Sequence, residues 1–250
     1  MKKDYAGKPF RNMVAIGDSI TMGASATKRE YSWVCRLSAL ISQFQEEEMA
    51  FYNAGVSGNL LSERSCAYDD ADSGKPSGLE RIERDVISRK PDLVIISYGL
   101  NDVRAGTPIE LFLDDLDLMV QKVRKETKAL IVIVNTYFMT GYKDYSGVWG
   151  HADLKSTRRY NSRMKKYAKM NDLLYADAYG AQGNASWVVD RDGVHPNNLG
   201  HLLIANKVFE IIAANCSCLS VKANKEGDEY FRKGSSERWF NEYELPMRKE

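Results

Sequence analysis

Short apolar runs rich in β-branched residues alternate along this chain with longer segments whose apolar residues recur at helical spacing. Such alternation is typical of an α/β fold, because two parallel strands are joined by a long crossover that is usually a helix. Several runs are apolar throughout, as expected of strands buried on both faces. We therefore predict a five-stranded parallel sheet between two layers of helices. The strands are expected at residues 12–16, 49–53, 93–97, 130–136 and 173–176.

Most segments that connect or follow the predicted strands carry an apolar stripe, which indicates a helix with one buried face, and the segment at 157–169 is rich in basic residues. The clearest helix start has Thr107 as N-cap, Pro108 at the first helical position and Glu110 placed to reach back. No linker rich in proline, glycine or serine interrupts the series, so residues 10–215 are predicted to form one domain. Helices are expected over residues 33–44, 79–90, 108–123, 157–169 and 198–214.

Composition excludes several classes of partner. Thirty-five basic and 34 acidic side chains leave a formal charge of +1, which gives no electrostatic case for binding nucleic acid or an anionic membrane. No run approaches the roughly 18 apolar residues of a membrane-spanning helix, and no signal-peptide core follows the first residues. We expect a cytoplasmic protein that acts on a small molecule or another protein. Four cysteines at irregular spacing are expected to be reduced thiols without a metal.

Residues 216–250 differ in character from the predicted domain. The last 30 residues carry seven basic and seven acidic side chains, interspersed with five aromatic ones. A purely solvating tail rarely has so many aromatic residues. We predict an extension that docks on its own domain or on a second subunit, which would make the protein a homo-oligomer. The aromatic residues are Tyr230, Phe231, Trp239, Phe240 and Tyr243.

Polar residues follow the predicted strands where a parallel sheet places its ligand site, outside the carboxyl ends of the strands. A serine, Ser19, comes directly after the first strand, and a serine hydroxyl becomes nucleophilic when a base takes its proton. Of three histidines, His201 lies at the start of the last helix and His151 lies in a loop of uncertain position. His195 is therefore the best candidate base.

The orienting acid of His195 has two candidates. Asp192 precedes the histidine by three residues across a glycine, a spacing that lets both side chains point the same way from one tight turn. Asp190 is a second acid nearby, and spacing alone does not exclude it. We favour Asp192.

Four short segments that carry these polar residues resemble, together and in this order, the motif blocks of the GDSL-type or SGNH hydrolases. This family consists of serine esterases and lipases on a flavodoxin-like three-layer α/β/α fold. The resemblance covers residues 10–215 and implies that fold. The segments are Gly17-Asp18-Ser19-Ile20, Val56-Ser57-Gly58-Asn59, Gly99-Leu100-Asn101-Asp102 and Asp192-Gly193-Val194-His195. Isoleucine at position 20 replaces the leucine that the family name implies, on a side chain that does not touch the chemistry.

The resemblance also implies a role for each matching residue. Ser19 would be the nucleophile, with His195 as base and Asp192 as its orienting acid. The oxyanion would be bound by the backbone N–H groups of Ser19 and Gly58 and by the side-chain amide of Asn101. A plain turn glycine is the alternative for Gly58. Mechanistically, preorganised donors of this kind stabilise the charge that develops on an ester carbonyl under attack.

The loop at residues 137–149 is aromatic and glycine-containing and is expected at the edge of the site, where loops often set specificity. Aromatic and polar groups together would suit a sugar ring, although a loop that only packs on the domain edge is an equal alternative. Asn59 and Leu60 are expected to line the acyl side. The other candidate substrate-binding residues are Tyr137, Tyr142 and Trp149.

We expect a serine esterase that hydrolyses short-chain carboxylic esters, acetyl esters of carbohydrates among them, through a Ser19 acyl-enzyme and without a cofactor. A metal-dependent phosphoesterase is disfavoured, because three histidines and no paired Asp-x-His supply a two-metal site poorly. Two alternatives remain open. One is an acyltransferase that uses the same acyl-enzyme, and the other is a non-catalytic binding protein on this fold.

Overall fold

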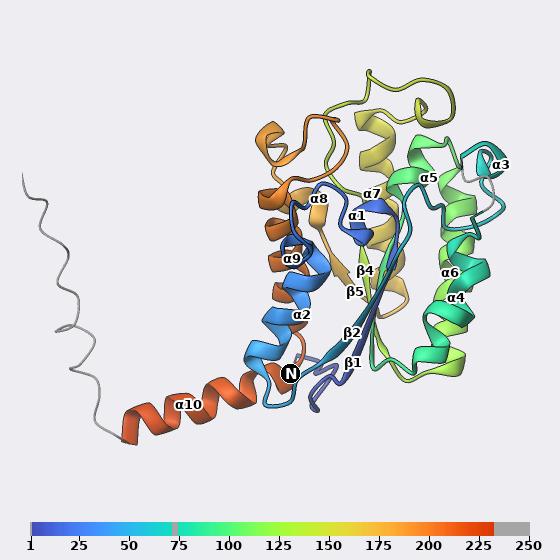
Figure 1. Cartoon of the computed structure of the whole chain (residues 1–250). Coiled ribbons are helices and arrows are strands. Elements are labelled where there is room, and N and C mark those ends of the chain that lie inside the picture. Colours follow the sequence, from blue (N-terminus) through green and yellow to red (C-terminus); the bar gives the residue numbers. More distant parts are fainter. Residues whose placement is uncertain (1, 72–74, 233–250) are drawn as a thin grey trace, which may run out of the picture.

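A computed structural model describes residues 2–71 and 75–232 of the chain. Its five strands form one parallel sheet in the order β2-β1-β3-β4-β5, between layers of helices (Figure 1). This is the flavodoxin-like strand order. The predicted fold class is therefore confirmed. The strands are β1 (Asn12–Gly17), β2 (Ala50–Gly55), β3 (Leu93–Ser97), β4 (Leu130–Val134) and β5 (Leu174–Ala176).

Helices and short 3₁₀ turns connect the strands. The first half of the chain contains α1 (Ser19–Met22), η1 (Arg29–Tyr31), α2 (Trp33–Phe44), α3 (Tyr68–Ala71), α4 (Gly78–Asp85), η2 (Ile87–Arg89), α5 (Leu100–Arg104) and α6 (Ile109–Glu126). The second half contains η3 (Gly147–Trp149), α7 (Leu154–Met170), α8 (Ala178–Ala181), η4 (Ser186–Val188), α9 (Asn198–Ala213), η5 (Ser217–Ser220) and α10 (Val221–Arg232). The predicted helix over residues 79–90 is thus two pieces, α4 and η2.

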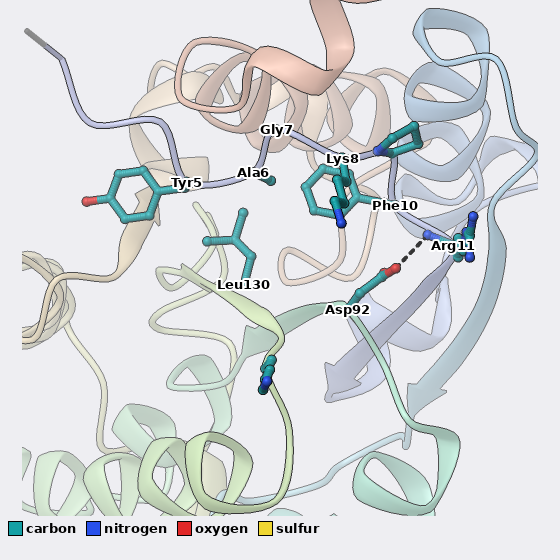
Figure 2. Close-up of a pocket in the computed structure, with 10 residues that line it drawn as sticks. Tyr5, Ala6, Gly7, Lys8, Phe10, Arg11, Asp92 and Leu130 are labelled. Carbon is teal, nitrogen blue, oxygen red and sulfur yellow. Dashed lines mark hydrogen bonds between the residues drawn. The ribbon is translucent and has the colours of Figure 1, made fainter.

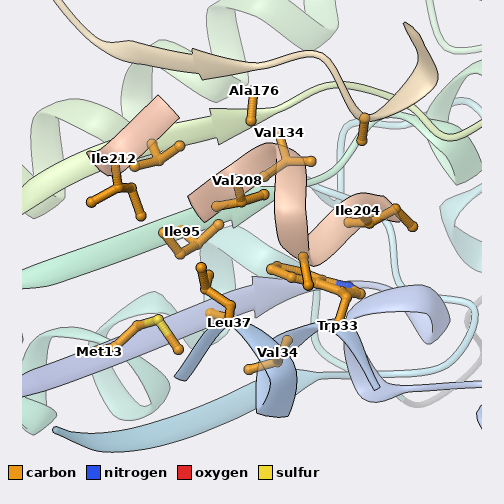
Figure 3. Packing of buried hydrophobic residues seen from close by; sticks show 14 of the residues in the cluster. Met13, Trp33, Val34, Leu37, Ile95, Val134, Ala176, Ile204, Val208 and Ile212 are labelled. Carbon is orange, nitrogen blue, oxygen red and sulfur yellow. The ribbon is translucent and has the colours of Figure 1, made fainter. Parts of the chain in front are cut away.

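The strands alternate their side chains between two hydrophobic cores, as the two-residue period of a β-strand requires. On one face Met13 and Ile95 pack against α2 and α9, and Figure 3 shows Leu37 and Val208 in the same cluster. On the other face Val14 and its neighbours pack against α4, α6 and α7. Both faces of the sheet are therefore covered, and the carboxyl ends of the strands are left to carry polar groups.

The predicted capping of α6 by Thr107 and Glu110 is wrong. The helix begins at Ile109 after Pro108, and no side chain caps it. The Thr107 hydroxyl instead lies 2.6 Å from the Ser65 hydroxyl. Glu110 does not reach back, because Arg159 and Arg163 on α7 bind its carboxylate. Tertiary partners have outcompeted the local capping box.

Residues after α9 continue the core before they leave it. Cys216, Cys218 and Leu219 are buried against the α2 and α9 side of the sheet. Helix α10 then extends away from the body (Figure 1), with Lys222 Nζ donating to the Gln43 carbonyl at 2.9 Å. Trp239, Phe240 and Tyr243 lie outside the described residues, so the docking role of the extension stays a prediction.

A membrane-spanning segment is not formed by any single helix of the described ranges, since none is both long and apolar enough. Helix α9 reaches that length only together with Ser217–Tyr230, at a bend of 100°.

A pocket of about 510 Å³ lies at the amino ends of the strands (Figure 2). Arg11, Asp92 and Leu130 line it, and these residues immediately precede or begin β1, β3 and β4. The Asp92 carboxylate accepts the backbone N–H of Arg11 at 2.7 Å. Ser19 follows the carboxyl end of β1, so this pocket lies at the opposite end of the sheet from Ser19.

Candidate active site

The turn from β1 into α1 presents Ser19 at the carboxyl end of β1, the second strand of the sheet. Asp18 caps the helix, because its carboxylate accepts the N–H of Ile20 at 2.9 Å. Gly17 must be a glycine, since an added Cβ would lie 2.3 Å from the Thr21 hydroxyl and 2.4 Å from the Ser97 carbonyl oxygen. This tight packing sets where Ser19 begins the helix.

Ser19, His195 and Asp192 form one hydrogen-bonded chain. Ser19 Oγ lies 2.9 Å from His195 Nε2, and His195 Nδ1 is bonded to Asp192 Oδ2. The other Asp192 oxygen accepts the N–H groups of Val194 at 2.9 Å and His195 at 3.0 Å. Although partial burial opposes them, these hydrogen bonds hold the pKa of Asp192 below its ordinary value. Such a chain can take a proton from a serine hydroxyl and return it to a leaving group.

The carboxylate of the competing acid, Asp190, is bonded to groups other than His195. Its carboxylate accepts the Arg191 N–H at 2.8 Å, and a hydrogen bond from the Ser25 side chain lowers its pKa. Only the backbone of Asp190 meets the histidine, through its N–H and the His195 carbonyl at 2.7 Å. Of the two aspartates that spacing left open, the structure brings Asp192 to the imidazole.

The other two histidines have separate places. His201 is fully buried, and its ring bonds the Ala24 carbonyl at 2.9 Å and the Trp33 N–H at 3.4 Å. Burial lowers the pKa of His201 to about 4, which keeps it neutral. The His151 N–H donates to the Arg104 carbonyl at 3.1 Å, and its side chain is exposed. Neither histidine is bonded to Ser19.

Two of the three candidate oxyanion donors, Gly58 and Asn101, follow the strands that flank β1. Gly17 is level with Gly55 on β2 and with Ser97 on β3. The chain therefore leaves all three strands at one height, and Gly58 and Asn101 follow within a few residues of that level. Gly58 has φ +75°, a conformation that favours glycine.

Asn101 is nearly buried near the start of α5, with 4% of its surface exposed. Its Nδ2 donates to the Asn59 carbonyl at 3.2 Å, and its Oδ1 accepts from Arg104 at 3.3 Å. The side-chain amide is therefore held at both ends.

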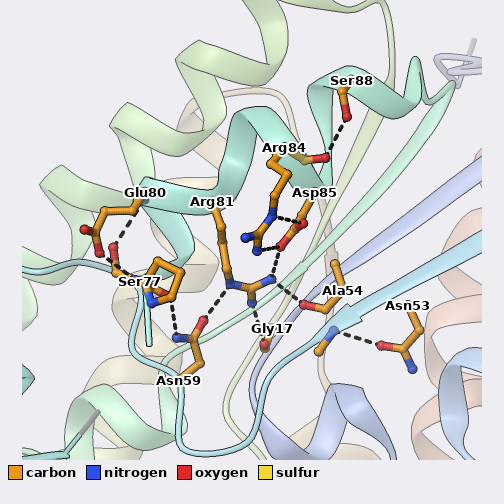
Figure 4. A network of polar contacts seen from close by, with 12 residues as sticks. Gly17, Asn53, Ala54, Asn59, Ser77, Glu80, Arg81, Arg84, Asp85 and Ser88 are labelled. Carbon is orange, nitrogen blue, oxygen red and sulfur yellow. Dashed lines mark hydrogen bonds and ion pairs between the residues drawn. The ribbon is translucent and has the colours of Figure 1, made fainter. Parts of the chain in front are cut away.

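Arg81 on α4 ties the same strand ends together (Figure 4). Its guanidinium donates to the carbonyls of Gly17 at 3.0 Å and Ala54 at 2.7 Å, and to Asn59 Oδ1 at 3.0 Å. Asp85, one turn along α4, balances the charge at 3.0 Å. Arg81 is only 2% exposed, so this network is buried, and it holds the loop that carries Gly58 through Ala54 and Asn59.

Two buried carboxyl groups lie beside the site. Burial raises the pKa of Asp18 to about 6 and the pKa of Asp102 to about 7, and the proximity of Asp18 adds to the second shift. Asp102 accepts the N–H groups of Leu61 and Gly99, each at 3.1 Å. It therefore ties the loop after β2 to the turn after β3.

Three expected substrate contacts are corrected by the structure, because their side chains lie inside the protein. Asn59 has no exposed surface, and its amide bonds Arg81, Tyr98 and the Pro76 carbonyl. Leu60 packs in a small buried cluster with Trp149, and Tyr137 lies in the core with its hydroxyl against Ser97. All three side chains point inward and not toward a substrate.

The other two candidates of the aromatic loop are half-buried. Tyr142 packs against both hydrophobic cores, and Trp149 lies over the guanidinium of Arg104 with 5.2 Å from the ring centroid to the guanidinium carbon. Their contact with substrate stays a prediction.

Sequence reasoning missed Arg81 and Arg104. Arg81 stands between the apolar residues Leu79 and Ile82, and its i,i+4 spacing to Asp85 was the one available signal. Arg104 follows the asparagine of the third motif block by three residues, which is one helical turn.

Solved structures resemble this fold along most of the chain. A lipase/acylhydrolase from Enterococcus faecalis superposes with a TM-score of 0.64 at 21% identity, covering 82% of this chain and 96% of that one. A two-domain esterase active on acetylated mannans gives 0.61 at 22% identity, covering 82% of this chain and 49% of that one. At such identities the likeness shows the fold.

Sequence comparison finds an acetylxylan esterase of Geobacillus stearothermophilus that is 24% identical over 220 residues, covering 77% of this chain and 90% of the relative. The family model described as GDSL-like Lipase/Acylhydrolase matches residues 15–203. This match spans the three strand-end turns and the Asp192–His195 loop and confirms the resemblance. The chain therefore belongs to the GDSL-like lipase/acylhydrolase family and is a carboxylic ester hydrolase.

Proposed function

We propose that this protein is a serine esterase that removes short acyl groups, acetyl above all, from carbohydrate esters. The observation that carries the proposal is the 2.9 Å separation between Ser19 Oγ and His195 Nε2, with Asp192 bonded to the far nitrogen of the ring. A hydrogen bond from Nδ1–H to the Asp192 carboxylate leaves Nε2 unprotonated, so that it can accept the serine proton, and the carboxylate stabilises the imidazolium that forms.

The reaction would proceed in two halves. Ser19 Oγ attacks the ester carbonyl while its proton passes to His195, and the N–H groups of Ser19 and Gly58 with the Asn101 amide receive the oxyanion. The imidazolium then protonates the ester oxygen of the sugar as its bond to the carbonyl carbon breaks, so the sugar departs as an alcohol and leaves an acyl-serine. Water attacks this ester with His195 again as base, releasing the carboxylic acid and restoring Ser19.

The substrate class is supported by the relatives and by the rim of the site. One relative is an acetylxylan esterase, and a structural neighbour is active on acetylated mannans. Tyr142, Tyr145 and Trp149 lie half-exposed on the loop above α5. Aromatic faces of this kind pack well against the apolar face of a sugar ring.

The first test is hydrolysis of p-nitrophenyl acetate, butyrate and octanoate by the wild type and by Ser19→Ala. We expect activity to fall with acyl length and to disappear in a Ser19→Ala protein whose melting curve is unchanged. Activity that survives this substitution would overturn the mechanism.

The second test measures acetate released from acetylated xylooligosaccharides and mannooligosaccharides, with p-nitrophenyl acetate as reference. A higher kcat/KM on the acetylated sugars is expected. Preference for octanoate, or no acetate released from either sugar, would overturn the carbohydrate assignment, and transesterified product in the presence of added alcohols would instead indicate an acyltransferase.

A further inference from the structure

Arg104 is a buried cation for which the reaction as outlined has no use. It is 6% exposed, and Nη1 of its guanidinium donates to Asn101 Oδ1 at 3.3 Å. Its Nε is buried and donates to no acceptor within residues 2–71 and 75–232. Burying a charge that is paired so sparsely is costly, so its retention needs a reason.

Two aromatic rings of the 137–149 loop hold this cation in place. The guanidinium carbon lies 4.5 Å from the ring centroid of Tyr145 and 5.2 Å from that of Trp149. Both distances are within the range of cation–π attraction, which strengthens when the cation is desolvated. The loop therefore acts as a clamp on Arg104.

The clamp is also bonded to the loop that carries the base. The Tyr145 hydroxyl donates to the Asp192 carbonyl at 2.8 Å. The N–H groups of Thr140 and Gly141 both donate to the Gly193 carbonyl, at 2.8 and 2.9 Å. One loop thus joins the Asp192–His195 turn to Arg104 and, through it, to Asn101.

The contacts of Asn101 allow only one orientation of its amide. With Oδ1 toward the guanidinium and Nδ2 toward the Asn59 carbonyl, both contacts are favourable. A flipped amide would place two donors against each other at Arg104 and two acceptors against each other at Asn59. The observed orientation leaves the second Nδ2 hydrogen available, and the adjacent cation polarises the amide and makes that hydrogen a stronger donor.

We propose that Arg104 is a positioning residue that orients and polarises the Asn101 amide for the oxyanion, and that Tyr145 and Trp149 hold it there. This inference rests on the proposed esterase function. It assigns the aromatic loop a role in transition-state stabilisation beside any contact that the loop makes with the sugar. Because Arg104 acts through Asn101, its effect must depend on that side chain.

The test is a double-mutant cycle on p-nitrophenyl acetate with Arg104→Met, Asn101→Ala and the pair. Removing a charge-assisted hydrogen bond of this kind is expected to lower kcat about 10- to 100-fold with KM nearly unchanged. In the Asn101→Ala background the same substitution should lower kcat less than about threefold, because the group it positions is gone. Arg163→Met is the control. It removes a partly exposed arginine of α7 that is ion-paired to Glu110 of α6, and it should keep wild-type kinetics.

Arg104→Lys keeps the charge and the aliphatic stem, and it completes the cycle if the methionine variant does not fold. It should recover part of kcat in the wild-type background only. A loss that is equally large with and without Asn101, or a loss of thermal stability without a change in kcat, would overturn this inference alone. Absence of Ser19-dependent hydrolysis in the wild type would overturn the proposed function and this inference with it.

Discussion

The two sides of Ser19 each carry an aspartate, and the two aspartates differ in burial and in the direction of their pKa shift. On the oxyanion side, which comprises Gly58, Asn101, Asp102 and the Arg81 network, Asp102 is 1% exposed and burial raises its pKa to about 7. On the base side, which is the loop from Asp190 to His195, the Asp192 side chain is 37% exposed and hydrogen bonds lower its pKa. One carboxyl group is buried for structure, and the other is kept ionised beside an imidazole.

This difference separates stability from chemistry. The oxyanion side is cross-linked by buried hydrogen bonds between three strand ends, so a change there disturbs the fold as well as the reaction. On the base side, the Asp192 and His195 side chains are partly exposed and bond each other, Ser19 and the backbone of their own turn, so replacing them alters the reaction and leaves the fold intact. Variants on the two sides should therefore differ in kind.

The largest effect is expected from His195→Ala. The substitution removes the group that accepts the serine proton, and kcat/KM should fall by roughly 10⁴- to 10⁶-fold. Because the histidine side chain is 24% exposed, the melting temperature should move by less than about 3 °C. Ester hydrolysis and calorimetry on the same preparation check both statements, and a large drop in melting temperature would contradict the separation of the two sides.

Asp192→Asn should follow, with a loss of about 10⁴-fold in kcat, because the amide no longer stabilises the imidazolium and can hold the wrong tautomer. Asp190→Asn is the matched control two residues away, since the Asp190 carboxylate bonds the Arg191 N–H and the Ser25 side chain. Its kcat should stay within about threefold of wild type. A larger loss in Asp190→Asn than in Asp192→Asn would reassign the orienting acid.

Arg81→Met tests the oxyanion side. The substitution leaves Asp85 and the carbonyls of Gly17 and Ala54 without their buried donor, which should lower the free energy of unfolding by about 3–5 kcal/mol. Arg84→Met removes a second partner of the same Asp85, but the Arg84 side chain is 68% exposed, so it should cost less than about 1 kcal/mol. Urea unfolding measures both, and equal losses would refute the importance of the buried network.

The sheet and the strand-end motifs could be predicted because their signals are local. An apolar run that forms a buried strand, and the glycine and aspartate that turn the chain after it, lie within a few residues of each other. The start of α6 shows the limit of such signals. Thr107 and Glu110 have the right spacing for a capping box, but Ser65 and two arginines of α7 bind them instead.

The buried Arg81 network could not be predicted, because its hydrogen bonds join distant parts of the chain. Arg81 reaches the Gly17 carbonyl 64 residues earlier and the Ala54 carbonyl 27 residues earlier. A backbone carbonyl carries no mark in the sequence that distinguishes it from others. The inward direction of Asn59 and Tyr137 was hidden for the same reason, since a motif gives a position along the chain and not the side to which a side chain turns.

The smallest expected effect concerns the pH dependence of stability and compares the two aspartates directly. With its pKa raised from 3.8 to about 7, Asp102 makes the folded protein bind more protons than the unfolded chain between those values. The free energy of unfolding therefore falls as the pH rises through this window. Asp102→Asn removes the titrating group, so the fall between pH 5 and pH 8 should be smaller than in the wild type by about 1–3 kcal/mol.

Asp192→Asn provides the opposite case. A carboxyl group with a lowered pKa contributes stability that is lost only as the pH falls below its ordinary value of 3.8. In a His195→Ala background, where no imidazole is paired with Asp192, Asp192→Asn should therefore leave the slope between pH 5 and pH 8 unchanged. Urea unfolding at pH 5, 6, 7 and 8, extrapolated to water, measures the slope for each protein. If Asp192→Asn flattened the slope and Asp102→Asn did not, the buried carboxyl would be the one that stays ionised, and the division between the two sides of Ser19 would be reversed.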